Sequence, residues 1–131
     1  MPTPHVHVVL IVEDDADSRE ALATALETLG MRVVCTDGGV GALGKLRDGV
    51  EPCMILLDAS MEGMDGAAFR RAQEADPRFR GFPVALLSGR DDLREHATRL
   101  GIGEALLKPV DPDELLRVVA RNCHLNHDRD A

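Results

Sequence analysis

Residues 6–15 read VHVVLIVEDD, a valine-rich apolar run from Val6 to Val12 that stops abruptly at three acidic residues. A near-continuous apolar run of this length is typical of a strand that is buried on both faces of a parallel sheet. Leucines and alanines then recur at three- and four-residue steps as far as Leu29, and Gly30 stands where a helix often ends. The stretch therefore predicts a buried strand that leads into a helix over 16–29, with carboxylates at the junction.

The same succession of strand and helix repeats along the rest of the chain. Further strands are predicted at 31–36, 53–57, 83–87 and 105–107, and further helices at 40–48, 67–75, 93–100 and from Pro112 onward. The last helix has Asp111 as its N-cap residue, with Pro112 and two acidic residues in its first turn. Because the strands are apolar runs rather than alternating patterns, these units predict an α/β domain whose parallel sheet is covered by helices on both faces.

Length and composition narrow the class of protein. A chain of 131 residues fits one compact domain, and its net charge of −8 argues against a nucleic-acid-binding surface. Its apolar runs fall far below the roughly 18 residues of a membrane span, and the first residues lack the apolar core of a secretory signal. We therefore expect a cytoplasmic protein that does not cross a membrane or bind nucleic acid directly.

The cysteines and the aromatic residues lead to two further expectations. Cys35, Cys53 and Cys123 are an odd number and lack the spacing of paired thiolate ligands, so we expect reduced thiols rather than a disulfide framework or a zinc site. Cys123 with His124 and His127 is better interpreted as a solvated terminus than as a metal site, because a fourth ligand is missing. Three Phe, without Tyr or Trp, predict an aliphatic core.

Polar side chains follow the predicted strands at the points where the strands end. Glu13 and Asp14 follow the first strand, Asp58 the third, Ser88 the fourth and Lys108 the fifth. Right-handed crossovers bring the carboxyl ends of parallel strands to one edge of the sheet, which is where ligands bind in such folds. Converging carboxylates repel one another unless a cation neutralises them, and Mg²⁺ combines one or two protein carboxylates with phosphate oxygens. The sequence therefore predicts a magnesium site at this edge, with a phosphate supplied by a partner.

The chemistry of these residue types suits phosphoryl transfer. The carboxylate of Asp58 can act as a nucleophile and take a phosphoryl group as an acyl phosphate. Phosphoryl transfer requires neutralisation of the phosphoryl oxygens, to which the Lys108 ammonium and the Ser88 hydroxyl could contribute.

Five segments in order along the chain resemble one known family. They are VLIVEDD (9–15), ILLD (55–58), GMDG (63–66), LLS (86–88) and KP (108–109). With these motifs the chain resembles, from about residue 6 to residue 122, the CheY-like receiver domain of bacterial two-component response regulators. The resemblance implies a flavodoxin-like (βα)5 fold, a doubly wound five-stranded parallel sheet in strand order 2-1-3-4-5. It implies a receiver domain over 1–125 and a polar tail over 126–131.

The resemblance also implies a role for each site residue. Asp58 would be the phospho-acceptor and a metal ligand, Asp14 a direct ligand of Mg²⁺, and Glu13 the second acidic partner. The backbone carbonyl of Ser60 would complete the protein ligands, and Mn²⁺ is an alternative ion.

At the phosphoryl group, Ser88 and Lys108 would contact the phosphoryl oxygens, and the Lys108–Pro109 bond would be cis. The implied function is that of a signalling domain rather than an enzyme. A sensor histidine kinase or phosphotransfer protein would phosphorylate Asp58, and slow hydrolysis would reverse the reaction. Phosphorylation would then change the binding of a downstream protein, or homodimerisation, at the face of the fourth helix, fifth strand and fifth helix.

Three positions depart from the family pattern. Glu62 stands where proline is common, and Gly89 stands where a small residue such as alanine is common. Ala105 occupies the position of a Tyr or Phe that in many receivers rotates inward on phosphorylation. We therefore expect the signal to leave through movement of the Ser88 loop and the fourth helix.

Other interpretations of the same residues remain open. A magnesium-dependent phosphatase with a strand-end aspartate nucleophile needs a second carboxylate two residues later, where this chain has Ser60. A binding module that no longer takes phosphate is the second alternative. Asp15 is best explained as a helix cap, and the glycines at 38–41 as an ordinary turn rather than a phosphate-binding loop.

Overall fold

The computed structural model of the chain describes residues 7–60, 65–89 and 93–123. Every helix in these ranges is too short or too polar to span a membrane. The expectations for Glu62, for the GM of the GMDG motif and for the tail, including His124 and His127, lie outside the described residues.

Strands and helices alternate through the described residues, and each falls within a few residues of its predicted range. In chain order they are β1 (Val8–Val12), α1 (Ala16–Thr28), β2 (Arg32–Thr36), α2 (Gly39–Arg47), β3 (Met54–Asp58), α3 (Gly66–Ala75), β4 (Val84–Ser88), α4 (Leu93–Arg99), β5 (Glu104–Leu107) and α5 (Pro112–Cys123).

All neighbouring strands of the sheet are parallel, and their order is β2-β1-β3-β4-β5. This confirms the predicted flavodoxin-like topology. The order reverses direction between β1 and β3, which lie side by side although a strand and two helices separate them in the chain. Ligands of doubly wound sheets bind where the order reverses, at the carboxyl ends of the strands. Glu13 and Asp58 lie at this position.

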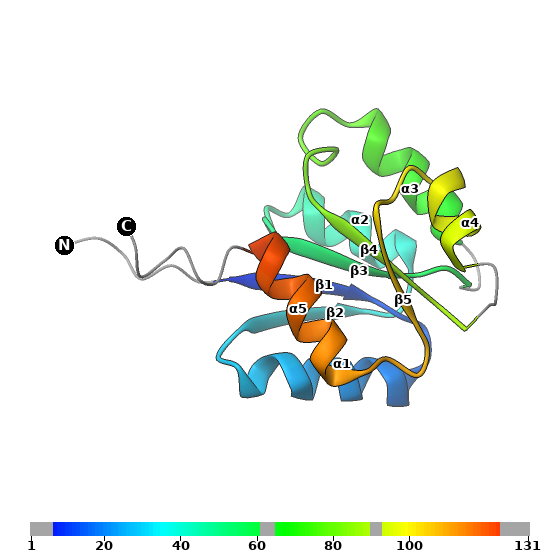
Figure 1. The fold of residues 1–131 in the computed structure, drawn as a ribbon. Helices are drawn as coiled ribbons and strands as arrows, with labels where there is room; N and C mark the ends of the chain where they lie inside the picture. The colour runs from blue at the N-terminus through cyan, green and yellow to red at the C-terminus, as the bar shows by residue number, and fades with distance from the viewer. Residues whose placement is uncertain (1–6, 61–64, 90–92, 124–131) are drawn as a thin grey trace.

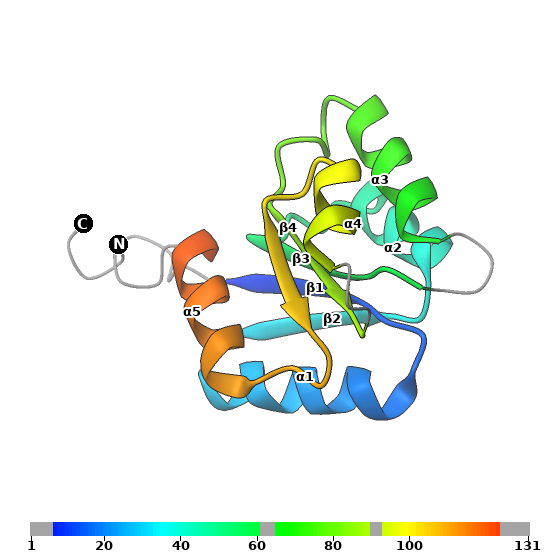
Figure 2. The same cartoon turned by 45° about the vertical axis from the view of Figure 1, so that its right-hand side comes forward.

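The helices cover both faces of the sheet. Figures 1 and 2 show α1 and α5 on one side, and α2, α3 and α4 on the other. Successive residues of β1 alternate between the two cores, because Leu10 belongs to the cluster with Phe69 of α3, whereas Ile11 belongs to the cluster with Leu26 of α1. Burial on both faces explains why the central strands β1, β3 and β4 are continuous apolar runs.

Local signals set several helix ends. Asp15 caps α1, because its carboxylate accepts a hydrogen bond from the backbone N–H of Ser18 at 2.8 Å, and this bond is the first cause of its lowered pKa. This confirms the interpretation of Asp15 as a helix cap. Gly30 and Gly101 follow α1 and α4 with φ of 85° and 70°, a conformation that glycine adopts without steric cost.

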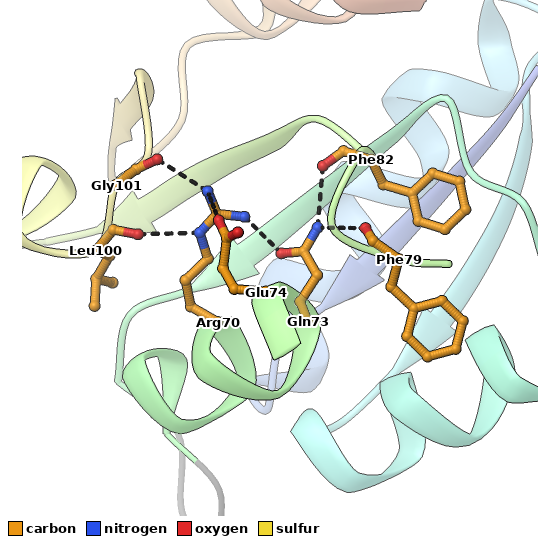
Figure 3. Close-up of polar contacts among 7 residues, drawn as sticks. All are labelled: Arg70, Gln73, Glu74, Phe79, Phe82, Leu100 and Gly101. Carbon is orange, nitrogen blue, oxygen red and sulfur yellow. Dashed lines mark hydrogen bonds and ion pairs between the residues drawn. The ribbon is translucent and has the colours of Figure 1, made fainter. Parts of the chain in front are cut away.

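A polar network ties α3 to the two loops beside it (Figure 3). Arg70 donates from Nε to the Leu100 carbonyl at 3.0 Å and from Nη2 to the Gly101 carbonyl at 2.9 Å. Its Nη1 donates to the side-chain oxygen of Gln73 at 2.7 Å. The fully buried amide of Gln73 in turn donates to the carbonyls of Phe79 and Phe82. These bonds connect α3 to the end of α4 and to the segment before β4.

One expectation about the cysteines is wrong. Cys53 and Cys123 form a disulfide, with their Cα atoms 5.0 Å apart. They are 70 residues apart in the chain, and only the packing of α5 against the sheet beside β3 brings them together. Counting cysteines and their spacing therefore could not reveal the pair. Cys123 is consequently not available as a metal ligand, whereas Cys35 is an exposed free thiol.

Candidate functional site

Three carboxylates meet at the carboxyl edge of the sheet. Glu13 and Asp14 follow β1 directly, and Asp58 is the last residue of the neighbouring strand β3. One carboxylate oxygen from each of the three lies within 4.8 Å of the others. Glu13 and Asp58 are buried, with exposed fractions of 0% and 4%, whereas Asp14 is exposed. The structure therefore brings together the three acidic residues predicted to form the site.

Backbone and side-chain bonds hold Glu13 in place. Its N–H donates to the Thr36 carbonyl at 3.1 Å, and its carbonyl accepts from Arg19 Nη1 at 2.8 Å. Its Oε2 accepts from the backbone N–H of Asp15 at 3.2 Å. Arg19 is a residue that the sequence analysis did not identify, since only the fold of α1 against β1 places it there.

Lys108 brings a positive charge to two of the carboxylates. Its Nζ lies 2.5 Å from Glu13 Oε1 and 3.3 Å from Asp58 Oδ1. Burial alone lowers the pKa of Lys108, but the bonds and charges of the two carboxylates outweigh it and raise the pKa overall. The Lys108–Pro109 bond is cis, as the resemblance implied.

The surroundings of Asp58 raise the pKa of its carboxyl. The pKa is raised from 3.8 to about 7, chiefly by burial and then by the hydrogen bond and negative charge of Glu13. The charge of Lys108 and the backbone N–H of Ser60, which donates to Oδ1 at 3.3 Å, oppose it. The buried Asp58 carboxylate therefore has too little positive charge around it to offset burial and the neighbouring Glu13.

Ser88 lies at the same edge of the sheet as the carboxylates and Lys108. It is the last residue of β4 and only 2% exposed, and it stands one residue past Leu87, the register partner of Asp58. Its carbonyl accepts the backbone N–H of Lys108 at 2.9 Å. The strand ends therefore place Ser88 between the segments that carry Asp58 and Lys108. Ser60, two residues beyond Asp58, is exposed.

A cleft of about 210 Å³ borders the site between α1 and α5. Glu13 and Lys108 form its polar end, and Leu22 and Leu115 lie among the apolar residues that line the rest.

A family model for the response regulator receiver domain matches residues 9–120, which is most of the chain. The chain belongs to this family. The matched region contains all five strands from Val9 onward, and therefore includes Asp58, Ser88 and Lys108. The family assignment and the strand order confirm the resemblance to a receiver domain.

Curated relatives differ in how much of their length this receiver domain covers. It is 33% identical over 117 residues to an uncharacterized 14.6 kDa protein of Leptolyngbya boryana, and the match covers 88% of each. It is 30% identical over 125 residues to the DNA-binding response regulator MtrA of Mycobacterium tuberculosis, and covers 94% of this chain but 53% of MtrA. The chain thus spans about half the length of MtrA.

Solved structures share the fold. A response regulator receiver protein from Pseudomonas putida is 30% identical, with a TM-score of 0.81 over 91% of this chain and 99% of that one. The receiver domain of a sensor histidine kinase from Pseudomonas aeruginosa is 26% identical, with a TM-score of 0.81 over 92% and 99%. That second structure holds a magnesium ion in its active site cleft.

The acidic residues of this receiver domain fit a hard divalent cation. The cluster offers only carboxylate oxygens, which are the ligands that Mg²⁺ prefers. Lys108 is the cation paired with both buried carboxylates and lies closer to Glu13 than to Asp58, and burial and Glu13 raise the pKa of Asp58. A cation bound between Asp14 and Asp58 would supply the missing charge.

Gly66 is a further residue of the site that the sequence analysis used only as part of a motif. A Cβ at this first residue of α3 would lie 3.2 Å from the Asp58 carbonyl oxygen and 3.3 Å from the Ala59 Cα. Glycine therefore allows α3 to begin against the backbone that carries Asp58. The signal was present in the GMDG motif, but the close approach depends on the tertiary fold.

Proposed function

We propose that this receiver domain accepts a phosphoryl group on Asp58 from a histidine kinase or phosphotransfer protein in a magnesium-dependent reaction. The observation that carries the proposal is the buried Asp58 carboxylate at the end of β3, with two acidic residues and the Lys108 ammonium beside it. Receiver domains are regulatory phosphoacceptor domains, and we propose that slow hydrolysis of the acyl phosphate returns this one to its resting state.

In the proposed reaction an oxygen of Asp58 attacks the phosphorus of a phosphohistidine. The new P–O bond forms as the P–N bond breaks, and the bonding electrons leave with the imidazole, which takes up a proton. The ion, held by Asp14, Asp58 and the Ser60 carbonyl with Glu13 beside them, would neutralise phosphoryl oxygens. Lys108 then binds one of these oxygens as a point charge, and the Ser88 hydroxyl donates to another.

The output surface that we propose is the face of α4, β5 and α5. Here Arg121 of α5 pairs with Glu104 of β5 through two contacts, Nη2 to Oε2 at 2.8 Å and Nε to Oε1 at 3.1 Å. Arg94, Glu114 and Arg117 line the same shallow pocket. Mixed charge of this kind suits a second copy of the domain or a charged protein target. We further propose a cytoplasmic location, a domain over 1–125 and a tail over 126–131.

A phosphatase is less well supported. Such an enzyme would need a general acid or base beside the nucleophile, and the residue two positions after Asp58 is Ser60, an exposed serine. Slow loss of a single phosphoryl group fits this set of side chains better than multiple turnover.

The test is incubation with a small phosphodonor and Mg²⁺, followed by intact-mass measurement. We expect the wild-type protein to gain one phosphoryl group, the Asp58→Asn variant to gain none, and the exposed control Asp48→Asn to behave as wild type. No gain in the wild-type protein would contradict the proposal and favour a binding module. Continuous release of phosphate from esters would favour the phosphatase.

A further inference from the structure

The disulfide lies far from the proposed phosphorylation site. Cys53 directly precedes β3, and its backbone N–H donates to the Val8 carbonyl at 2.8 Å, where β1 begins. Cys123 is the last residue of α5. Figure 1 shows this end of α5 near the start of β1, at the edge of the sheet opposite the carboxyl ends of the strands. A change at this pair can therefore act on α5 without touching Asp58.

The two cysteine residues differ in their exposure to solvent. Cys123 is only 3% exposed and belongs to the core cluster shared by α1, α5 and the sheet, whereas Cys53 is half-buried at the margin of that cluster. The 5.0 Å between their Cα atoms in the bonded form lies within the range that a disulfide requires. Cys53 is therefore the sulfur that a reagent in solution reaches first.

The fold does not depend on this bond in the way that small secreted domains do. Two aliphatic clusters, one on each face of the sheet, supply the core. A domain of this size buries enough apolar surface to fold without a disulfide, and stabilising disulfides are typical of much shorter secreted chains. The exposed free thiol of Cys35 is also consistent with a protein whose cysteines are not all permanently oxidised.

We propose that Cys53 and Cys123 are a reversible thiol–disulfide couple that fastens the end of α5 to the sheet. The oxidant is a small-molecule disulfide. The Cys53 thiolate attacks one of its sulfurs, forms a mixed disulfide and releases one thiol. The Cys123 thiolate then attacks Cys53 Sγ and releases the second thiol. Two protein thiols are thereby oxidised, the reagent disulfide is reduced to two thiols, and a dithiol reverses the reaction.

Oxidation restrains the end of α5 that carries Arg121. In the reduced protein this turn is held by the burial of Cys123 and by the exposed Arg121–Glu104 pair, and exposed ion pairs hold a helix only weakly. In the oxidised protein a covalent bond is added two residues beyond Arg121. An effect of this restraint on partner binding at the α4–β5–α5 face rests on the proposed function. The thiol–disulfide couple itself does not rest on it.

In the test, the reduced 131-residue chain is treated with excess oxidised glutathione and then with dithiothreitol at neutral pH, without denaturant. In Cys35→Ala, which lacks the exposed thiol that would itself form a mixed disulfide with the reagent, we expect the intact mass to fall by two hydrogen atoms, a linked peptide that contains Cys53 and Cys123, and full reversal by the dithiol. Cys35→Ala should form the bond as the wild-type protein does, and Cys53→Ala should not. Thiols that stay reduced, or a bond that is reduced only after unfolding, would overturn the proposal.

Hydrogen exchange then measures the restraint on α5. We expect amides near the end of 112–123 to exchange on the order of tenfold more slowly in the oxidised protein, because opening of the last turn is restricted, while α2 is unchanged. Equal exchange of α5 in both forms would also overturn the proposal. Phosphorylation of Asp58 is measured separately, so failure of the proposed function and failure of this couple give different results.

Discussion

The Lys108 ammonium lies 2.5 Å from Glu13 Oε1, closer than its 3.3 Å distance from Asp58 Oδ1. In this state the lysine therefore bonds chiefly to Glu13 and only partly neutralises Asp58. A phosphoryl group on Asp58 adds negative charge and acceptor oxygens. We expect these oxygens to draw Lys108 from Glu13 toward the phosphoryl group, which couples β5 to the chemistry at β3.

Replacing Lys108 by methionine should raise the pKa of Asp58 further. The charge of Lys108 opposes the effects of burial and of Glu13, so its loss favours the protonated carboxyl. The measurement is an NMR titration of the Asp58 side-chain carbon in metal-free protein. Lys45→Met, at an exposed position of α2, is the control and should leave the titration unchanged. An Asp58 that titrates at the same pH in Lys108→Met would show that the lysine does not act on it.

The stability of the metal-free protein should depend on pH through Asp58. Its pKa rises from 3.8 to about 7 on folding, so its contribution to stability is fully present below pH 3.8 and is lost as the pH rises through about 7. Mg²⁺ should offset this loss, because it stabilises the ionised carboxylate. The measurement compares urea unfolding of the wild-type protein and of Asp58→Asn over this pH range, with EDTA or with Mg²⁺. Parallel pH profiles of the two proteins in EDTA would refute the expectation.

The predicted parts of the fold and site rest on patterns that are local in the sequence. Apolar runs that end in a polar residue located all five strands, and parallel crossovers were enough to place Glu13, Asp58 and Lys108 at one edge. The three central strands β1, β3 and β4 were found because burial on both faces leaves a plain apolar signal in each, whereas the edge strands β2 and β5 are less buried. Strand order 2-1-3-4-5 came from family resemblance rather than from periodicity.

The parts that were missed depend on contacts between distant segments. Cys53 meets Cys123 only after α5 has packed, and Arg70 reaches the Leu100 carbonyl across 30 residues. From the sequence, an arginine on a helix is interpreted as a solvated cation, because the hydrogen bonds that it donates to distant carbonyls leave no pattern in the sequence. The close approach of Gly66 to the Asp58 backbone is likewise a property of the packed fold.

Gly66→Ala should be destabilising, and Gly44→Ala should not. The new methyl group at residue 66 would press on the backbone of Asp58 and Ala59, at a cost of about 1–3 kcal/mol. A methyl group at Gly44 within α2 meets nothing within 4 Å and should stabilise the protein by about 0.5–1 kcal/mol. Urea unfolding measures both. Gly66→Ala should also slow phosphorylation of Asp58, and equal stability of the two variants would show that α3 can move away without cost.

Arg70→Ala should loosen the end of α4. The guanidinium donates to the carbonyls of Leu100 and Gly101, which follow the helix, and it orients the buried amide of Gln73 (Figure 3). The loss of these charged hydrogen bonds should cost about 1.5–3 kcal/mol, whereas Arg71→Ala, at an exposed position of α3, should change stability by less than about 0.5 kcal/mol.

The same variants test how the signal leaves the site. If the end of α4 is anchored by Arg70, movement on phosphorylation is concentrated at its beginning, next to the Ser88 loop. Hydrogen exchange should then show faster exchange near residue 100 in Arg70→Ala but not in Arg71→Ala, with and without phosphoryl group. Arg70→Lys, which keeps the charge but loses the paired geometry, should recover only part of the protection. Identical exchange in Arg70→Ala and wild type would mean that packing of Ala97 and Ile102 alone holds this end of the helix.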